Sequence, residues 1–262
     1  MCLLIFAHRI NPKYPLLVAA NRDEFYERPT RSSRFWSEHP DLLAGKDENL
    51  GGTWMGATKD GKFAAVTNFR DPQALPSYPR SRGELPLNYL AGQTSPKQYL
   101  RKISDEADQY AGFNLLIGDP QGLWYFCNQS TTQGQSLAEA RELQPGIYGL
   151  SNAHLDTPWP KVALGKQRLE QLLLSSDDIG HDHLQQLVSD PSPAPPAQLD
   201  RLGMNSALEQ MLSAQFISAQ DYGTRSTTTL WSHTSGETSW REISYNSMGQ
   251  IVETTLEDFA RG

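Results

Sequence analysis

Residues 1–24 read MCLLIFAHRINPKYPLLVAANRDE, and this stretch decides the fold. Two apolar runs, 2–7 and 15–21, flank a polar turn, which predicts a pair of antiparallel strands at the start of the chain. A cysteine directly follows the initiator methionine, and four polar residues, NRDE, close the second run. Because the end of the second strand of a hairpin lies beside the start of the first, we expect Arg22 to lie near Cys2.

Beyond this hairpin, the sequence alternates further strand patterns with blocks of helix. Strands are expected at 53–58, 62–69, 113–118, 122–127, 146–152, 225–232, 238–245 and 250–256. Helices are expected to begin after Ser95 and Thr157, which are the residue types that cap helix N-termini, and at His181. The segments 25–40 and 190–197 are expected to be surface loops, the second because its prolines remove backbone donors.

This order of elements predicts the fold class. Hairpins dominate, so the sheets should be mostly antiparallel, and the helices come in blocks rather than after each strand. The continuously apolar strands need cover on both faces. We therefore expect an α+β protein, a four-layer α-β-β-α sandwich of two mostly antiparallel sheets, formed by a single domain over residues 1–262 with a proline-rich surface loop at 190–197.

Composition excludes several function classes. The 262 residues are 38% hydrophobic and carry a net charge of −7, which is typical of a globular protein without the basic face that nucleic-acid binding requires. No apolar run reaches the ~18 residues of a transmembrane segment, and residues 2–7 are too short for a signal peptide. Cys2 and Cys127 are the only cysteines, which favours a reducing, cytoplasmic location. The expected partner is a small-molecule substrate or ligand; the oligomeric state stays open.

Metal binding has little support in the sequence. The only suggestive histidine spacing is His181-Asp182-His183, and it falls at the exposed start of a helix. We therefore expect no metal site.

Cys2 has the chemistry of an N-terminal nucleophile. Removal of Met1 leaves a free α-amine, whose pKa of ~7.7–8.0 is close to the thiol pKa of ~8.5. The amine can then accept the thiol proton, so that one residue supplies both nucleophile and base. Arg22 would favour the thiolate, while Asp23 would bind the α-ammonium or pair with Arg22. The alternatives are a small core residue at position 2 and a solvated turn with an internal salt bridge.

Two asparagines and a second arginine complete the candidate site. Asn68 and Asn152 each end an apolar strand, where a carboxamide N–H can donate to an oxyanion. Taken singly, each is more typical of a turn-forming asparagine. Arg225 starts a strand, and by itself it would be read as a surface charge.

Together with Met1-Cys2, eight ordered blocks carry a family resemblance. They are LVAANRDEF (17–25), GGTWMG (51–56), AAVTN (64–68), RGEL (82–85), GFNL (112–115), YGLSN (148–152), TPWPK (157–161) and YGTR (222–225). In this order the chain resembles the NRDE family, whose animal members are called transport and Golgi organisation proteins.

The resemblance implies the N-terminal-nucleophile hydrolase fold and, more distantly, similarity to its cysteine branch, the bile-salt hydrolases and penicillin V acylases. Its catalytic roles carry over to Cys2, Arg22, Asp23, Asn68, Asn152 and Arg225. Contacts to substrate are expected from Asn21, Glu24 and Trp54. One departure stands out: in that branch the aspartate follows the arginine by three residues, whereas here the two are adjacent.

Two functions remain open at this stage. The first is a cysteine hydrolase of a C–N amide bond in a small or acyl-amide substrate, which needs no cofactor. The alternative is a non-catalytic protein that binds and traffics haem or an acyl-CoA or lipid in the same cavity. Haem has no independent support, because neither a Cys-Pro dipeptide nor a clear axial ligand is present.

Overall fold

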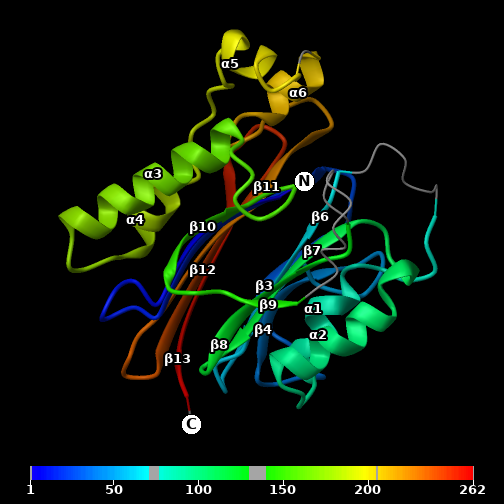
Figure 1. Cartoon of the computed structure of the whole chain (residues 1–262), viewed down its shortest axis with the longest axis vertical. Helices are drawn as coiled ribbons and strands as arrows, with labels where there is room; N and C mark the ends of the chain where they lie inside the picture. The colour runs from blue at the N-terminus through cyan, green and yellow to red at the C-terminus, as the bar shows by residue number, and fades with distance from the viewer. Residues whose placement is uncertain (1, 71–76, 130–139, 205, 262) are drawn as a thin grey trace.

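The computed structural model describes residues 2–70, 77–129, 140–204 and 206–261. Two sheets pack face to face, and helices cover the outer side of each (Figure 1). This arrangement confirms the expected four-layer α-β-β-α sandwich. Within these ranges, none of the helices combines the length and the apolar character needed to cross a membrane.

The first sheet is built from both ends of the chain. Its strands, in order across the sheet, are β10 (Gly146–Leu150), β1 (Cys2–His8), β2 (Leu16–Phe25), β11 (Tyr222–Ser232), β12 (Glu237–Tyr245) and β13 (Ile251–Ala260). All neighbours in this sheet pair antiparallel. β1 is buried along its whole length, because it lies inside the sheet and is covered on both faces.

The second sheet comes from the middle of the chain and is also antiparallel. Its strands, in order, are β3 (Thr30–Phe35), β4 (Leu42–Asp47), β5 (Met55–Thr58), β6 (Phe63–Asn68), β7 (Phe113–Asp119), β8 (Gly122–Cys127) and β9 (Arg141–Glu142). Buried side chains of both sheets form the central core, in which Leu4, Phe6, Leu116 and Trp240 pack together.

The outer layers are helical. On the second sheet lie α1 (Glu84–Ala91), α2 (Pro96–Asp105) and the short 3₁₀ turn η1 (Ala107–Gln109). On the first sheet lie α3 (Pro160–Ser175) and α4 (His181–Gln186), and the short helices α5 (Pro196–Asp200) and α6 (Ala207–Leu212) follow. Gly165 lets α3 approach β1 closely, since a Cβ there would lie 2.5 Å from Ile5.

Two local expectations are wrong. Residues 25–40 are not a continuous loop, because they contain β3, a largely polar strand whose alternation carries no apolar signal. Thr157 does not cap α3: its hydroxyl donates to the carbonyl of His154, and the helix begins with Trp159 at the N-cap and Pro160 at the first helical position. Within the expected proline-rich loop 190–197, residues 190–195 are irregular, and residues 191–195 are exposed except for Ala194. Pro196 and Ala197 instead begin α5, because proline is tolerated in the first turn of a helix.

Candidate active site

A cavity of about 690 Å³ opens between the ends of the two sheets, and Cys2 forms part of its wall. The first sheet contributes charged residues from the end of β2 and from β11 and β12. The second sheet contributes residues of β3, β4 and β6, together with Trp54 and the segment before α1. The candidate site therefore lies where the two sheets meet.

Cys2 and Arg22 face each other across the first hairpin. They are directly paired in the antiparallel register of β1 and β2, so their side chains lie on the same face of the sheet. This face points to the second sheet, because Cys2 belongs to the central core. The sequence-based expectation that Arg22 lies near Cys2 is confirmed.

Cys2 is 9% exposed, and burial of its thiol raises the thiol pKa above the ordinary value. The negative charge of Asp23 acts in the same direction. The charge of Arg22 and a hydrogen bond from the backbone N–H of Asp23 act in the opposite direction, since both favour the thiolate. Ser151 also fixes this end of β1, because its hydroxyl donates to the carbonyl of Cys2 at 2.8 Å.

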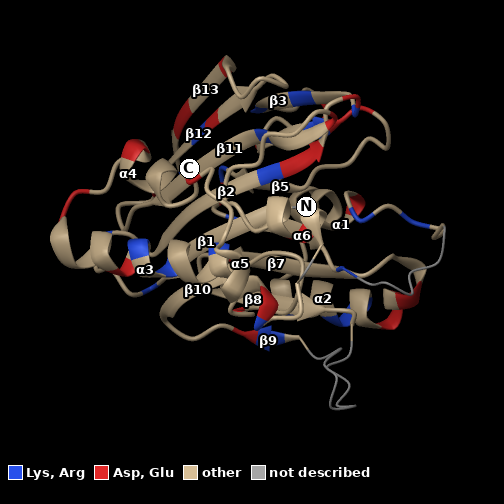
Figure 2. Cartoon of the chain, turned by 90° about the horizontal axis from the view of Figure 1, so that it is seen from above, with Lys and Arg blue, Asp and Glu red and all other residues tan. Residues whose placement is uncertain are grey.

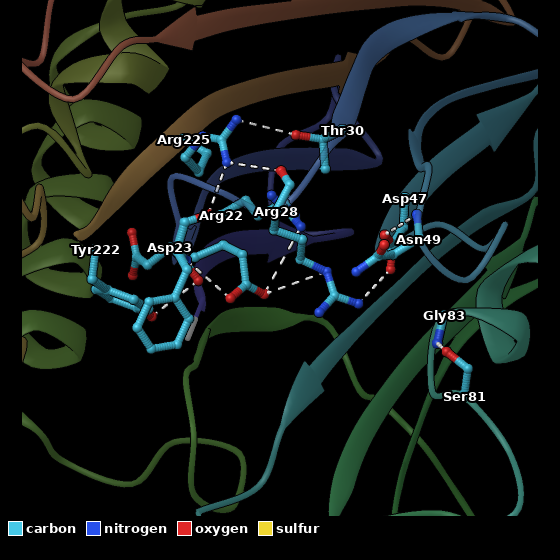
Figure 3. Close-up of polar contacts among 12 residues, drawn as sticks. Arg22, Asp23, Arg28, Thr30, Asp47, Asn49, Ser81, Gly83, Tyr222 and Arg225 are labelled. Carbon is cyan, nitrogen blue, oxygen red and sulfur yellow. Dashed lines mark hydrogen bonds and ion pairs between the residues drawn. The ribbon is translucent and has the colours of Figure 1, made fainter.

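Asp23 lies on the opposite face of β2 from Arg22, because successive side chains of a strand alternate. The Thr224 hydroxyl donates to its Oδ1 at 2.8 Å. The Tyr222 hydroxyl donates to its backbone carbonyl at 3.0 Å (Figure 3). The ion pair of Arg22 is formed with Glu24 instead, at 3.9 Å. The adjacent spacing of Arg22 and Asp23 thus sends the two side chains into different layers.

Lys161 is a site residue that sequence reasoning missed. It lies in the first turn of α3 and is 2% exposed, and its Nζ has no hydrogen-bond partner among the described residues. Burial lowers its pKa, while the negative charges of Asp23 and Cys2 raise it. Burial raises the pKa of Asp23, and the charge of Lys161 is the strongest opposing influence. Asp23 and Lys161 therefore form a buried pair in which the charge of each group shifts the pKa of the other.

The two asparagines occupy different positions. Asn68 is exposed at the end of β6 and lines the cavity. Asn152 is 1% exposed, and its side-chain nitrogen donates to the backbone carbonyl of Asn68 at 2.8 Å. Its Oδ1 accepts from the Ser151 hydroxyl at 3.1 Å. Asn152 thus holds the backbone of Asn68 in place, and of these two asparagines Asn68 is the one that lines the cavity.

Arg225 is the extra residue of a β-bulge, because the pairing of β11 with β2 shifts between Thr224 and Ser226. Its Nη1 donates to the backbone carbonyls of Phe25, Tyr26 and Arg28 at 2.9–3.1 Å. Its Nη2 donates to Thr30 (Figure 3). The guanidinium is thus committed to the turn that connects β2 with β3, although its residue lines the cavity.

Of the three expected substrate contacts, Glu24 and Trp54 line the cavity and Asn21 does not. Asn21 is completely buried on the helix-covered face. Its Nδ2 donates to the carbonyls of Val188 and Gln215, and its Oδ1 accepts from Thr227. The expectation for Asn21 is therefore wrong, for the reason that separates Arg22 from Asp23: neighbouring positions on a strand face opposite sides.

Two further wall residues escaped the sequence analysis. Arg82 precedes α1, and Glu242 is a buried carboxyl of β12 whose pKa is raised by burial. Arg82 was visible in the RGEL block, whereas nothing in the sequence distinguishes Glu242 from other strand carboxylates. The expected removal of Met1 concerns a residue outside the described ranges.

The comparisons with known proteins agree with the resemblance. The family model described as Transport and Golgi organisation 2 matches residues 1–247. The Transport and Golgi organization protein 2 homolog of Bos taurus is 33% identical over 279 residues, covering 99% of each chain. The homolog of Homo sapiens is 34% identical over 266 residues, covering 93% of each.

Two solved structures are similar at low identity. One is the Caenorhabditis elegans N-acylethanolamine-hydrolyzing acid amidase ortholog, with 10% identity, a TM-score of 0.49, and coverage of 87% of this chain and 92% of that one. The other is a variant of the conjugated bile acid hydrolase of Clostridium perfringens, with 12% identity, a TM-score of 0.48, and coverage of 99% and 98%. The whole-length sequence matches decide the family: the chain belongs to the Transport and Golgi organisation 2 family.

Proposed function

We propose that the protein hydrolyses a C–N amide bond of a small or acyl-amide substrate, with the Cys2 thiol as nucleophile. The observation that carries this proposal is the position of Cys2. It heads β1, lies in the wall of a 690 Å³ cavity and faces Arg22 across the hairpin. A thiol next to a guanidinium, with access to a cavity, is a setting that favours nucleophilic attack.

The thiol needs a base, because burial raises its pKa and disfavours the thiolate. In the proposed reaction, the α-amine left by removal of Met1 accepts the thiol proton. The sulfur forms a bond to the amide carbonyl carbon, and the electron pair of the C=O bond moves to oxygen. The exposed carboxamide of Asn68 is the side chain that we assign to this oxyanion.

The remaining steps return the enzyme to its starting state. When the tetrahedral adduct collapses, the C–N bond breaks and the leaving amine takes the proton held by the α-amine. Water then attacks the thioester carbon, and the C–S bond breaks. The products are a carboxylic acid and an amine, and the Cys2 thiol is regenerated.

Intact-mass analysis combined with a thiol-reactive probe tests this proposal. We expect the mature chain to lack Met1 and the probe to label wild-type protein but not Cys2→Ala. Cys127→Ala is the matched control, because Cys127 is 1% exposed and burial raises its pKa to about 11. It should be labelled like the wild type. Retention of Met1 on a folded protein would remove the base and refute the proposal.

A second candidate is a carrier that binds a ligand in this cavity without turnover; it is favoured by the burial of Cys2, which raises the pKa of the thiol and disfavours the thiolate. A carrier should bind its ligand equally well after Cys2→Ala, whereas an enzyme should lose turnover. The described lining contains neither histidine nor methionine, so the side chains that it could offer to haem iron are Cys2, Tyr78 and Tyr245. A haem titration without a specific Soret shift would exclude haem as the ligand of such a carrier.

A further inference from the structure

The cavity that contains Cys2 is basic, although the protein as a whole is acidic. Among the described residues of its wall, seven are lysine or arginine and five are aspartate or glutamate. The chain as a whole carries a net charge of −7. Figure 2 shows charged segments of β2 and β3 near one another at the same end of the sandwich. A wall enriched in cations favours an anionic ligand.

Most of these cations are already neutralised by carboxylates. Arg22 pairs with Glu24, Arg28 with Asp47, Arg31 with Glu48, Lys46 with Glu38, and Arg80 with both Glu84 and Glu106. Arg225 has no carboxylate partner in the described ranges, but its guanidinium is bonded to three backbone carbonyls and to Thr30.

Arg82 is different. Across residues 2–70, 77–129, 140–204 and 206–261, its side chain makes one hydrogen bond, from Nη1 to the carbonyl of Gly112 at 3.0 Å, and no ion pair. A guanidinium has five N–H donors, so most of the donors of Arg82 remain available. Among the lining cations of the described residues, it combines the absence of a carboxylate partner with a guanidinium that makes a single hydrogen bond.

The backbone around Arg82 is held in place by two glycines. A Cβ on Gly52 would lie 2.4 Å from the carbonyl carbon of Gly83, so the two chain segments can approach this closely only without a side chain there. The Thr53 N–H donates to the Gly83 carbonyl at 3.0 Å. This contact fixes the start of the Arg82 side chain in the cavity wall.

Arg82 also lies within electrostatic range of the nucleophile. Burial lowers its pKa, and negative charge on Cys2 opposes this effect more strongly than that on Glu24 does. Arg82 and Cys2 line the same cavity. A ligand group bound by Arg82 would therefore lie near the group that reacts with Cys2.

We propose that Arg82 forms a subsite beside Cys2 that binds an anionic group of the substrate. The substrate is an acyl amide that carries this group, a carboxylate or a phosphate, near its scissile bond. This inference rests on the proposed function, because it places the substrate in the Cys2 cavity. Carboxylate and phosphate share the oxygen geometry that a guanidinium binds through two N–H groups, so both groups fit the free donors.

Two alkylating reagents of similar size test the subsite without knowledge of the substrate. Iodoacetate carries a carboxylate and iodoacetamide is neutral, and both react with a thiolate. Rates are measured in the Cys127→Ala background, so that Cys2 is the only thiol. We expect Arg82→Gln to lower the ratio of the iodoacetate rate to the iodoacetamide rate by at least about tenfold, as loss of a charge-assisted hydrogen bond implies.

The control is Arg34→Gln, which removes an exposed arginine of β3 outside the cavity wall and should leave the ratio unchanged. Arg82→Lys should retain part of the preference, since it keeps the charge. An unchanged ratio in Arg82→Gln would overturn the inference. An equal fall of both rates also leaves the ratio unchanged, and it would mean that Arg82 acts on the thiolate rather than on the ligand.

Protection experiments distinguish the two ligand groups. Inorganic phosphate and acetate are each added during alkylation by iodoacetamide, and slower alkylation that depends on Arg82 identifies the preferred anion. If Cys2 reacts with neither reagent, the proposed hydrolase function is refuted. The subsite is then tested separately, by calorimetric titration of the protein with phosphate and with acetate. Binding that is lost in Arg82→Gln supports the subsite, and absence of binding to the wild type overturns it.

Discussion

Cys2 and Arg22 are direct partners in the antiparallel register of β1 and β2, and their side chains share the face that lines the cavity. This pairing places a cation beside the thiol, and the charge of Arg22 is one of the influences that oppose the effect of burial on the thiol pKa. Any substitution of Arg22 should therefore change the pH at which Cys2 becomes a nucleophile.

Arg22→Gln should move the pH profile of Cys2 alkylation upward by about one pH unit, because a nearby cation favours the thiolate and its removal raises the thiol pKa. The rate constant for iodoacetamide should be measured from pH 6 to pH 11 in the Cys127→Ala background. Arg34→Gln should leave the profile in place. An unshifted profile in Arg22→Gln would show that Arg22 does not act on the thiol.

Lys161→Met should destabilise the protein by about 3–5 kcal/mol, because it removes the strongest of the cationic influences that stabilise the buried Asp23 carboxylate. The loss should depend on pH. With the folded-state pKa of Asp23 raised further, the native state binds more protons than the unfolded state, so stability falls as pH rises above the unfolded value near 4. Thermal unfolding at pH 5 and pH 8 should therefore show the larger loss at pH 8.

The double variant Lys161→Met/Asp23→Asn is the control for this pair. It removes both charges, so it should be more stable than Lys161→Met alone and should lose most of the pH dependence. Equal losses at both pH values in Lys161→Met would mean that packing, rather than the charge of Lys161, accounts for the effect.

The sequence could predict the location of the site because one feature determines it. The apolar runs of β1 and β2 are uninterrupted, and a short hairpin leaves little freedom in pairing, so the proximity of Cys2 and Arg22 follows from the pattern alone. The four-layer architecture follows similarly, since strands apolar on both faces need two covering layers.

Other parts of the site depend on contacts that no local pattern encodes. Lys161 reads as an ordinary polar position near a helix start, and only the packing of α3 on β1 buries it. β3 was missed because its polar side chains follow no apolar alternation. The bulge at Arg225 could not be anticipated either, because it is a register shift between strands about 200 residues apart in sequence.

Gly52→Ala should cost about 1–3 kcal/mol of stability, because the new methyl group would lie 2.4 Å from the backbone of Gly83 and force the two segments apart. Since the same contact holds Arg82, the preference for iodoacetate should fall as well. Urea unfolding and the alkylation ratio measure the two effects. Gly180→Ala is the control, because a Cβ there meets nothing within 4 Å. A wild-type ratio in Gly52→Ala would mean that Arg82 does not depend on the glycine contact.

Arg225→Gln should reduce stability by about 2 kcal/mol, because it removes the donors that three backbone carbonyls of the β2–β3 connection share. Hydrogen exchange should accelerate in residues 25–30, whereas the pH profile of Cys2 alkylation should stay in place, since the pKa of the thiol responds to Arg22 rather than to Arg225. The catalytic role that the resemblance implies for Arg225 leads to the opposite result: a protein of normal stability whose Cys2 no longer reacts. Urea unfolding and alkylation of the same sample therefore decide whether this arginine holds the loop or acts in the reaction.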